Sequence, residues 1–170
     1  MVSTLPSWSR WLVAATISLH AAEATAHEEI GFGGHVAYGL GGALADHAMG
    51  AGLRQNLDAS FLIGSFDVQH SSIGMWSSRS GWMVGPMIAT GFSEYPTYLG
   101  AEAGLGADSG LVGGAGLLGL LARVHPAAGG GATVRFAADL VLVQLGIRAV
   151  AVFVGSPEFQ LTGTMGVGRF

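Results

Sequence analysis

Large apolar residues alternate with small or polar ones along much of this chain, with the period of two that indicates β-strands. Between residues 29 and 40 most even positions are large and apolar, whereas the odd positions hold Glu, Gly, His or Ala. Comparable alternation recurs in residues 82–92, 97–106, 133–142 and 159–167. Each predicted strand therefore has one apolar face and one face of small or polar side chains.

Nine segments have this character, at residues 30–41, 48–55, 57–67, 80–92, 97–107, 110–123, 131–140, 142–154 and 159–170. The predicted connections are Gln55-Asn56, Ser93 to Pro96, His125 to Gly131 and Ser156 to Glu158. Single-chain bacterial barrels have an even number of strands, so we expect a segment within Ala43 to Phe66 to be joined to its neighbour or dropped. Eight strands of about ten residues with their turns then fit the length of the chain from His27 to Phe170.

The face of small or polar side chains distinguishes between two all-β architectures. In a soluble sandwich that face meets water and is rich in Lys, Glu, Thr and Arg. Here every basic residue is Arg, charged residues make up 11% of the chain, and 29 residues are Gly. Glycine suits the crowded inside of a narrow barrel. We therefore predict a closed antiparallel up-and-down transmembrane β-barrel, most simply of eight strands, whose large apolar side chains face lipid.

Composition excludes several other classes of protein. Hydrophobic residues make up 50% of the chain, which is too much for a disordered segment. Without Cys there is no disulfide scaffold and no cysteine-ligated zinc site. The net charge of −4 argues against a nucleic-acid binder. A membrane helix over residues 137–155 is disfavoured because Asp139, Gln144 and Arg148 interrupt its apolar run.

Residues 1–26 have the features of a cleavable secretory signal peptide. Arg10 supplies a positive charge, Trp11 to Ala22 form a short apolar stretch, and Ala24-Thr25-Ala26 matches a small-residue cleavage site. A transmembrane anchor is the alternative, but a spanning helix needs about 20 apolar residues, and His20 and Glu23 shorten this run. The predicted domains are thus the signal peptide, residues 1–26, and the barrel, residues 27–170.

The last segment, PEFQLTGTMGVGRF, ends in an aromatic residue, Phe170. It resembles the closing strand of small bacterial outer-membrane β-barrels of the OmpA-like and OmpX-like group. That resemblance implies export to the bacterial outer membrane, a monomer in contact with outer-membrane lipid, and recognition of the terminal strand, including Phe170, by the barrel-assembly machinery. One departure is that strict alternation from Phe159 through Val167 turns Phe170 toward the lumen, unless a bulge near Gly166 to Gly168 restores the outward register.

Charged residues of both signs fall on the predicted inner face. The expected lumen network consists of Glu29, His35, Glu102, Arg135, Asp139 and Arg148. Gln144, Gln160, Thr162 and Thr164 share that face, and Arg54 and Asp58 are further candidates. An eight-stranded barrel is just wide enough for side chains to fill it, and buried charges must be paired. We therefore expect a plugged lumen, with a narrow pore as the alternative.

Other motifs point to chemistry only weakly. The glycine runs at 113–116 and 129–131 lack the Gly-Lys-Ser/Thr sequence of a phosphate loop, and the spacing of the His residues does not favour a metal site. His70 and Ser72, with Asp67 upstream, are the residues for a Ser–His lipid-modifying hydrolase in the segment 68–80, predicted to be a loop. We expect instead a structural or surface-interaction protein, with no enzymatic activity and no cofactor.

Overall fold

The computed structural model describes residues 27–45, 52–70, 77–92 and 96–170. The predicted signal peptide, residues 1–26, lies outside the described residues. The strands are β1 (His27–Ala45), β2 (Gly52–His70), β3 (Ser77–Gly91), β4 (Thr97–Asp108), β5 (Val112–His125), β6 (Gly129–Leu140), β7 (Val143–Val154) and β8 (Glu158–Arg169). No helix in the described residues is long and apolar enough to cross a membrane.

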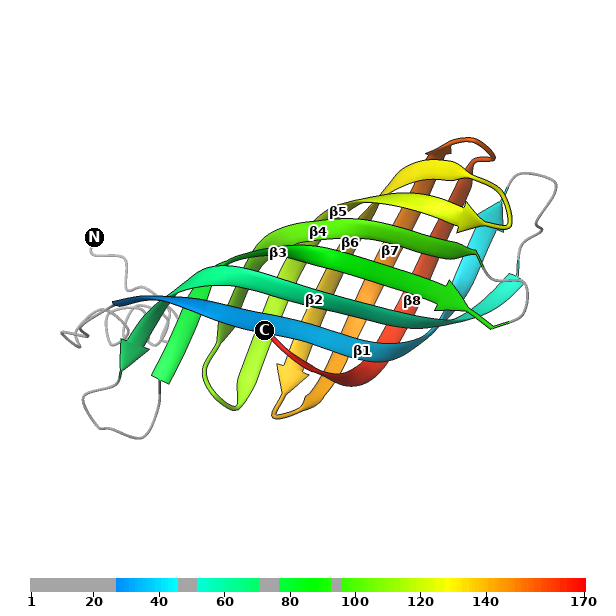
Figure 1. Ribbon diagram of the computed structural model, residues 1–170. Coiled ribbons are helices and arrows are strands. Elements are labelled where there is room, and N and C mark those ends of the chain that lie inside the picture. Colours follow the sequence, from blue (N-terminus) through cyan, green and yellow to red (C-terminus); the bar gives the residue numbers. More distant parts are fainter. Residues whose placement is uncertain (1–26, 46–51, 71–76, 93–95) are drawn as a thin grey trace, which may run out of the picture.

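Each strand pairs antiparallel with the next along the chain, and β1 also pairs with β8, which closes the sheet into a barrel (Figure 1). The predicted eight-stranded up-and-down barrel is therefore confirmed. The predicted connection at Gln55-Asn56 is wrong, because both residues lie within β2, opposite Leu40 and Gly39. Residues 52–55 and the segment 57–67 thus belong to one strand, and the nine predicted segments become eight; residues 48–51 lie outside the described residues.

The strands are strongly staggered around the ring. The chain of paired residues that starts at Ile30 runs through Ser65, Trp82, Leu105, Gly116, Phe136, Ile147 and Gly163 and returns to β1 at Leu40, ten residues further on. A stagger of this kind goes with the tilt of about 35–45° that closes small barrels. It also brings residues that are far apart in sequence to the same level of the lumen.

The alternation in the sequence places large apolar side chains on the outer wall. Phe32, Phe61, Phe136 and Phe153 are each more than half exposed. Trp82 on β3 and Phe92, the residue directly after β3, are exposed on the outer wall ten residues apart. At about 3.3 Å per residue and this tilt, that separation is roughly 25 Å along the barrel axis, the height of the apolar band of outer-membrane barrels.

The inner face carries the small and polar residues, and two apolar clusters fill part of the lumen. One includes Leu62, Phe66, Met83 and Phe170, and the other includes Tyr98. We call the end of the barrel with His27 and Phe170 the terminal end. At this end β1 extends beyond its last partner in β8, so residues 27–33 pair with β2 alone. At the opposite end β5 and β6, and likewise β7 and β8, are joined by three residues.

Candidate functional site

The candidate site is the charged centre of the lumen. His35 from β1, Asp58 from β2, Glu102 from β4, Arg135 from β6 and Arg148 from β7 converge there, and each is at most 4% exposed. The pleat turns each of them inward because each occupies the inner parity of its strand. The stagger then brings the five side chains to one level of the barrel.

Two cations and two carboxylates form the centre of this cluster. Arg148 contacts Asp58 through Nε at 2.7 Å and Glu102 through a terminal nitrogen at 3.1 Å. Arg135 lies 3.6 Å from the second oxygen of Glu102. Each carboxylate therefore faces at least one guanidinium, and this pairing offsets the cost of removing the charged groups from water.

His35 joins the cluster as a neutral imidazole. Its Nδ1 lies 2.5 Å from a terminal nitrogen of Arg135 and 2.8 Å from Ser60 Oγ. Because a guanidinium can only donate, Nδ1 is an acceptor and the ring proton resides on Nε2. Nε2 accordingly donates to Asp58 Oδ1, 3.2 Å away. The histidine thus connects Arg135 to Asp58 without adding a charge.

Phe170 closes the cluster on the side of the terminal end. Arg135 donates to the side-chain oxygen of Gln144, and Gln144 Nε2 donates to Asp139 Oδ1 at 2.7 Å. Asp139 Oδ2 accepts the backbone N–H of Phe170 at 3.1 Å. The Phe170 ring is 1% exposed and its centroid lies 5.4 Å from Arg135 Cζ. Since β8 pairs with β1 and β7 without a register shift, no bulge intervenes and Phe170 points into the lumen.

A second polar layer lies nearer the opposite end of the lumen. Arg123 donates to Glu158 Oε2 at 3.0 Å, and Tyr98 donates to the same oxygen at 3.0 Å. Gln160 Nε2 lies 2.5 Å from Glu158 Oε1. Arg123 and Glu158 were not among the predicted site residues, because the sequence pattern placed Arg123 at a strand end and Glu158 in a connection. Their inner parity, shared with Leu121 and Gln160, was the signal that could have found them.

Glu29 does not belong to the lumen network, contrary to the sequence-based expectation. It has the inner parity, but it lies on the part of β1 that extends beyond β8, and its side chain is 57% exposed. Its partner is His27, at 2.6 Å. Glu29 instead lines a mouth of about 480 Å³ at the terminal end, together with Arg79, Asp108 and Arg169. There Asp108 lies 2.7 Å from Arg169 and 3.4 Å from Arg79.

The residues proposed for hydrolysis are not brought together in the described structure. His70 is the last residue of β2 rather than part of a loop, and its exposed ring stacks on that of His27 with 5.3 Å between centroids. Asp67 lies three residues earlier on the same strand and therefore on the other face. Ser72 lies outside the described residues. In the described part of the chain no three acidic or His side chains are grouped to hold a metal ion.

No protein-family model and no curated protein sequence matches this chain. Among solved structures it is similar to Ail, the attachment invasion locus protein of Yersinia pestis, at 8% identity and a TM-score of 0.30. The complex of Ail with the heparin analogue sucrose octasulfate matches at 9% identity and a TM-score of 0.31. Each similarity covers 84% of this chain and 98% of the Ail chain. The closed ring and apolar outer wall described above give this chain the fold of a small outer-membrane β-barrel.

Proposed function

We propose that this protein is a monomeric barrel of the bacterial outer membrane with a plugged lumen and a structural or surface-interaction role. The observation that carries the proposal is the inverted distribution of polarity. Arg123, Arg135 and Arg148 are at most 1% exposed inside the barrel, whereas Phe32, Leu120 and Phe136 are more than 60% exposed outside it. Lipid suits such a wall better than water does, because water disfavours a continuous surface of large apolar side chains. The closed ring pairs its own backbone groups, so it needs no hydrogen-bond partners from the lipid.

Plugging is supported by the two polar layers. The Arg135–Arg148 cluster and the Arg123–Glu158 layer both consist of buried, mutually paired side chains. Large aqueous channels are found in barrels of about 16 strands, twice the number here. A narrow pore remains the competing function, and it would require these paired side chains to separate.

Export through the inner membrane by the predicted signal peptide and insertion by the barrel-assembly machinery complete the proposal. No enzymatic role is proposed, since His70 and Asp67 lie on opposite faces of β2. With the lumen closed, the functional surfaces of the protein are its two ends and its outer wall.

Membrane fractionation combined with a heat-modifiability gel tests the proposal. We expect the protein in the outer-membrane fraction, with an unboiled band that migrates differently from the boiled one because the closed barrel resists the detergent. Recovery as a soluble periplasmic protein would contradict both the location and the lipid-facing wall.

A further inference from the structure

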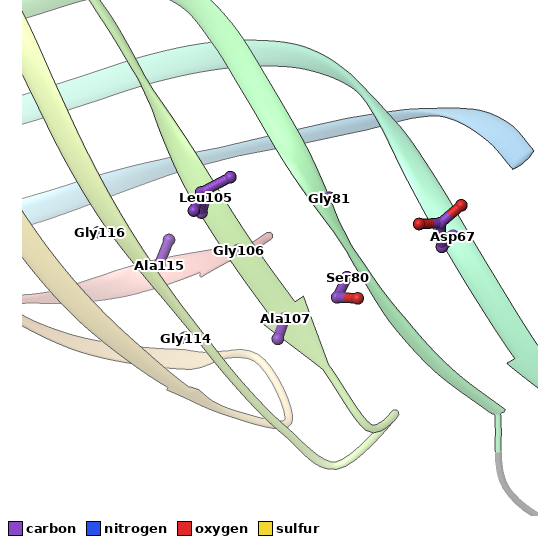
Figure 2. A pocket seen from close by; sticks show the side chains of 9 residues that line it. All are labelled: Asp67, Ser80, Gly81, Leu105, Gly106, Ala107, Gly114, Ala115 and Gly116. Atoms are coloured by element: carbon purple, nitrogen blue, oxygen red, sulfur yellow. The ribbon is translucent and has the colours of Figure 1, made fainter. Parts of the chain in front are cut away.

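The outer wall is hollowed near the terminal end, across β3, β4 and β5. The hollow has a volume of about 530 Å³ and is lined by Ser80, Leu105, Ala107, Gly114 and Gly116, with Asp67 at its edge (Figure 2). Ser80 pairs with Ala107, and Ala107 with Gly114, so that three small outward residues form one row across the strands. The next row contains Leu105 and Gly116, and a Cβ on Gly116 would lie 3.4 Å from the ring of Phe136.

A second hollow continues the first toward the middle of the barrel. It has a volume of about 500 Å³ and is lined mainly by Val84, Ala101, Ala103, Leu118, Leu120 and Ala132. Ala103 is the next outward residue after Leu105 on β4, and Leu118 follows Gly116 on β5. The two hollows therefore follow one another along the same strands, and together we call them the wall groove.

The length of this wall groove matches one leaflet of a bilayer. From Ala107 to Ala101 there are six residues of β4, or roughly 20 Å along the strand and about 15 Å along the barrel axis after the tilt. Half of a hydrocarbon core of about 30 Å is the same length. A single acyl chain fits that span.

The polar edge of the groove lies at headgroup depth. Trp82 is the outward residue next to Ser80 on β3, and it is 55% exposed. Tryptophan gathers where hydrocarbon meets headgroups, so Ser80 and its partner Asp67 lie on the headgroup side of that boundary.

The chemistry of this edge selects among phospholipids. Asp67 is exposed, and none of the ion pairs among the described residues includes it. Its carboxylate repels an anionic headgroup, and both it and the Ser80 hydroxyl can accept hydrogen bonds. A primary ammonium can donate to both oxygens, whereas a quaternary choline group cannot.

We propose that the groove binds one phospholipid with a primary-amine headgroup, its ammonium at Asp67 and Ser80 and one acyl chain along β4 and β5. This inference rests on the proposed placement of the barrel in a membrane.

Native mass spectrometry of the barrel released from vesicles tests this binding site. The vesicles contain equal parts of ethanolamine, choline and glycerol phospholipids with the same acyl chains. We expect one ethanolamine lipid retained per barrel. Asp67→Asn should lower the ratio of bound ethanolamine to choline lipid by about threefold to fivefold, the range of an exposed ion pair. Glu29→Gln, which removes the same charge at the mouth, should leave the ratio unchanged.

Two variants test the groove itself. Ala107→Leu fills the hollow and should abolish lipid retention, whereas Ala122→Leu, also outward on the neighbouring strand β5 but not lining either hollow, should not. Ser80→Ala provides a second change at the polar edge if Asp67→Asn does not fold. Equal retention of all three lipids, or Asp67→Asn without effect, would overturn the proposal, as would a dimer that Ala107→Leu dissociates. A heat-modifiability gel of each sample shows separately whether the barrel inserted, so failure of the membrane placement is distinguishable from failure of the lipid site.

Discussion

The ring of Phe170 lies over the guanidinium of Arg135, with 5.4 Å between the ring centroid and Cζ. The same phenylalanine is held by its backbone N–H on Asp139 and packs with Leu62 and Phe66. One residue therefore covers the charged centre of the lumen on the side of the terminal end and contributes to the apolar cluster beside it.

Removal of the Phe170 ring should destabilise the barrel. We expect Phe170→Ala to lower the free energy of unfolding by about 3–5 kcal/mol, because a buried aromatic is lost and a cavity remains. Phe170→Leu retains most of the apolar volume and should cost less, about 1–2 kcal/mol, including the lost cation–π contact. Urea unfolding in lipid vesicles measures both, and equal losses would contradict the cavity argument, because they would attribute the whole loss to the aromatic ring and none to the apolar volume of residue 170.

The pairing of Arg148 with two carboxylates can be tested by a double-mutant cycle. Arg148→Met leaves Asp58 with His35 alone and should cost about 3–5 kcal/mol, as expected when one partner of a buried ion pair is removed. Addition of Asp58→Asn should restore about half of that loss, because the uncompensated charge disappears. The partly exposed Arg79 provides the control, since Arg79→Met should cost less than about 1 kcal/mol. Strictly additive losses would contradict the pairing.

The free-energy cost of an outward arginine should depend on its depth in the membrane. Phe136→Arg near the middle of the outer wall should cost about 2–4 kcal/mol in vesicles, whereas Leu142→Arg in the turn at the terminal end should cost about 0–1 kcal/mol. Both side chains are more than 60% exposed, so a protein surrounded by water would tolerate the two changes equally. Unfolding free energies measured in the same vesicles distinguish these outcomes.

Glycine is required where neighbouring strands come close together. A Cβ on Gly104 would collide with the carbonyl oxygen of Gly116, whereas a Cβ on Gly42 would meet nothing within 4 Å. We expect Gly104→Ala to cost about 1–3 kcal/mol through overpacking, and Gly42→Ala to be neutral or to stabilise by up to about 1 kcal/mol. Thermal unfolding of the two variants side by side checks the difference; a reversed order would mean that the outer and inner faces are wrongly assigned.

Planar bilayer recordings test the closed lumen. If the two paired polar layers plug the lumen as proposed, the wild-type protein should show no stable large conductance. Arg148→Met is expected to admit only a small leak. A steady open pore in the wild-type protein would contradict the plugged lumen and support the narrow-pore function.

The sequence by itself determined the two faces of the wall. The alternation that assigns Phe136 outward and Arg135 inward is a local property, because successive side chains of any strand point to opposite sides. The closed architecture follows from the same pattern together with the scarcity of charge, and an even number of strands follows when every neighbouring pair in the closed ring is antiparallel. The same alternation places five polar residues in the lumen without any information on their pairing: His35, Glu102, Arg135, Asp139 and Arg148.

Tertiary structure decided which residues meet. The hydrogen-bond register around the ring sets the stagger, and no single strand contains that information. The register brings Asp58 to Arg148 and Arg123 to Glu158, leaves Glu29 beyond the end of β8, and joins two predicted segments into β2. It also keeps β8 free of a bulge, so that Phe170 turns inward onto Arg135. Alternation fixes only the side of the wall on which a residue lies, whereas closure of the whole sheet sets its height along the axis and therefore its partners.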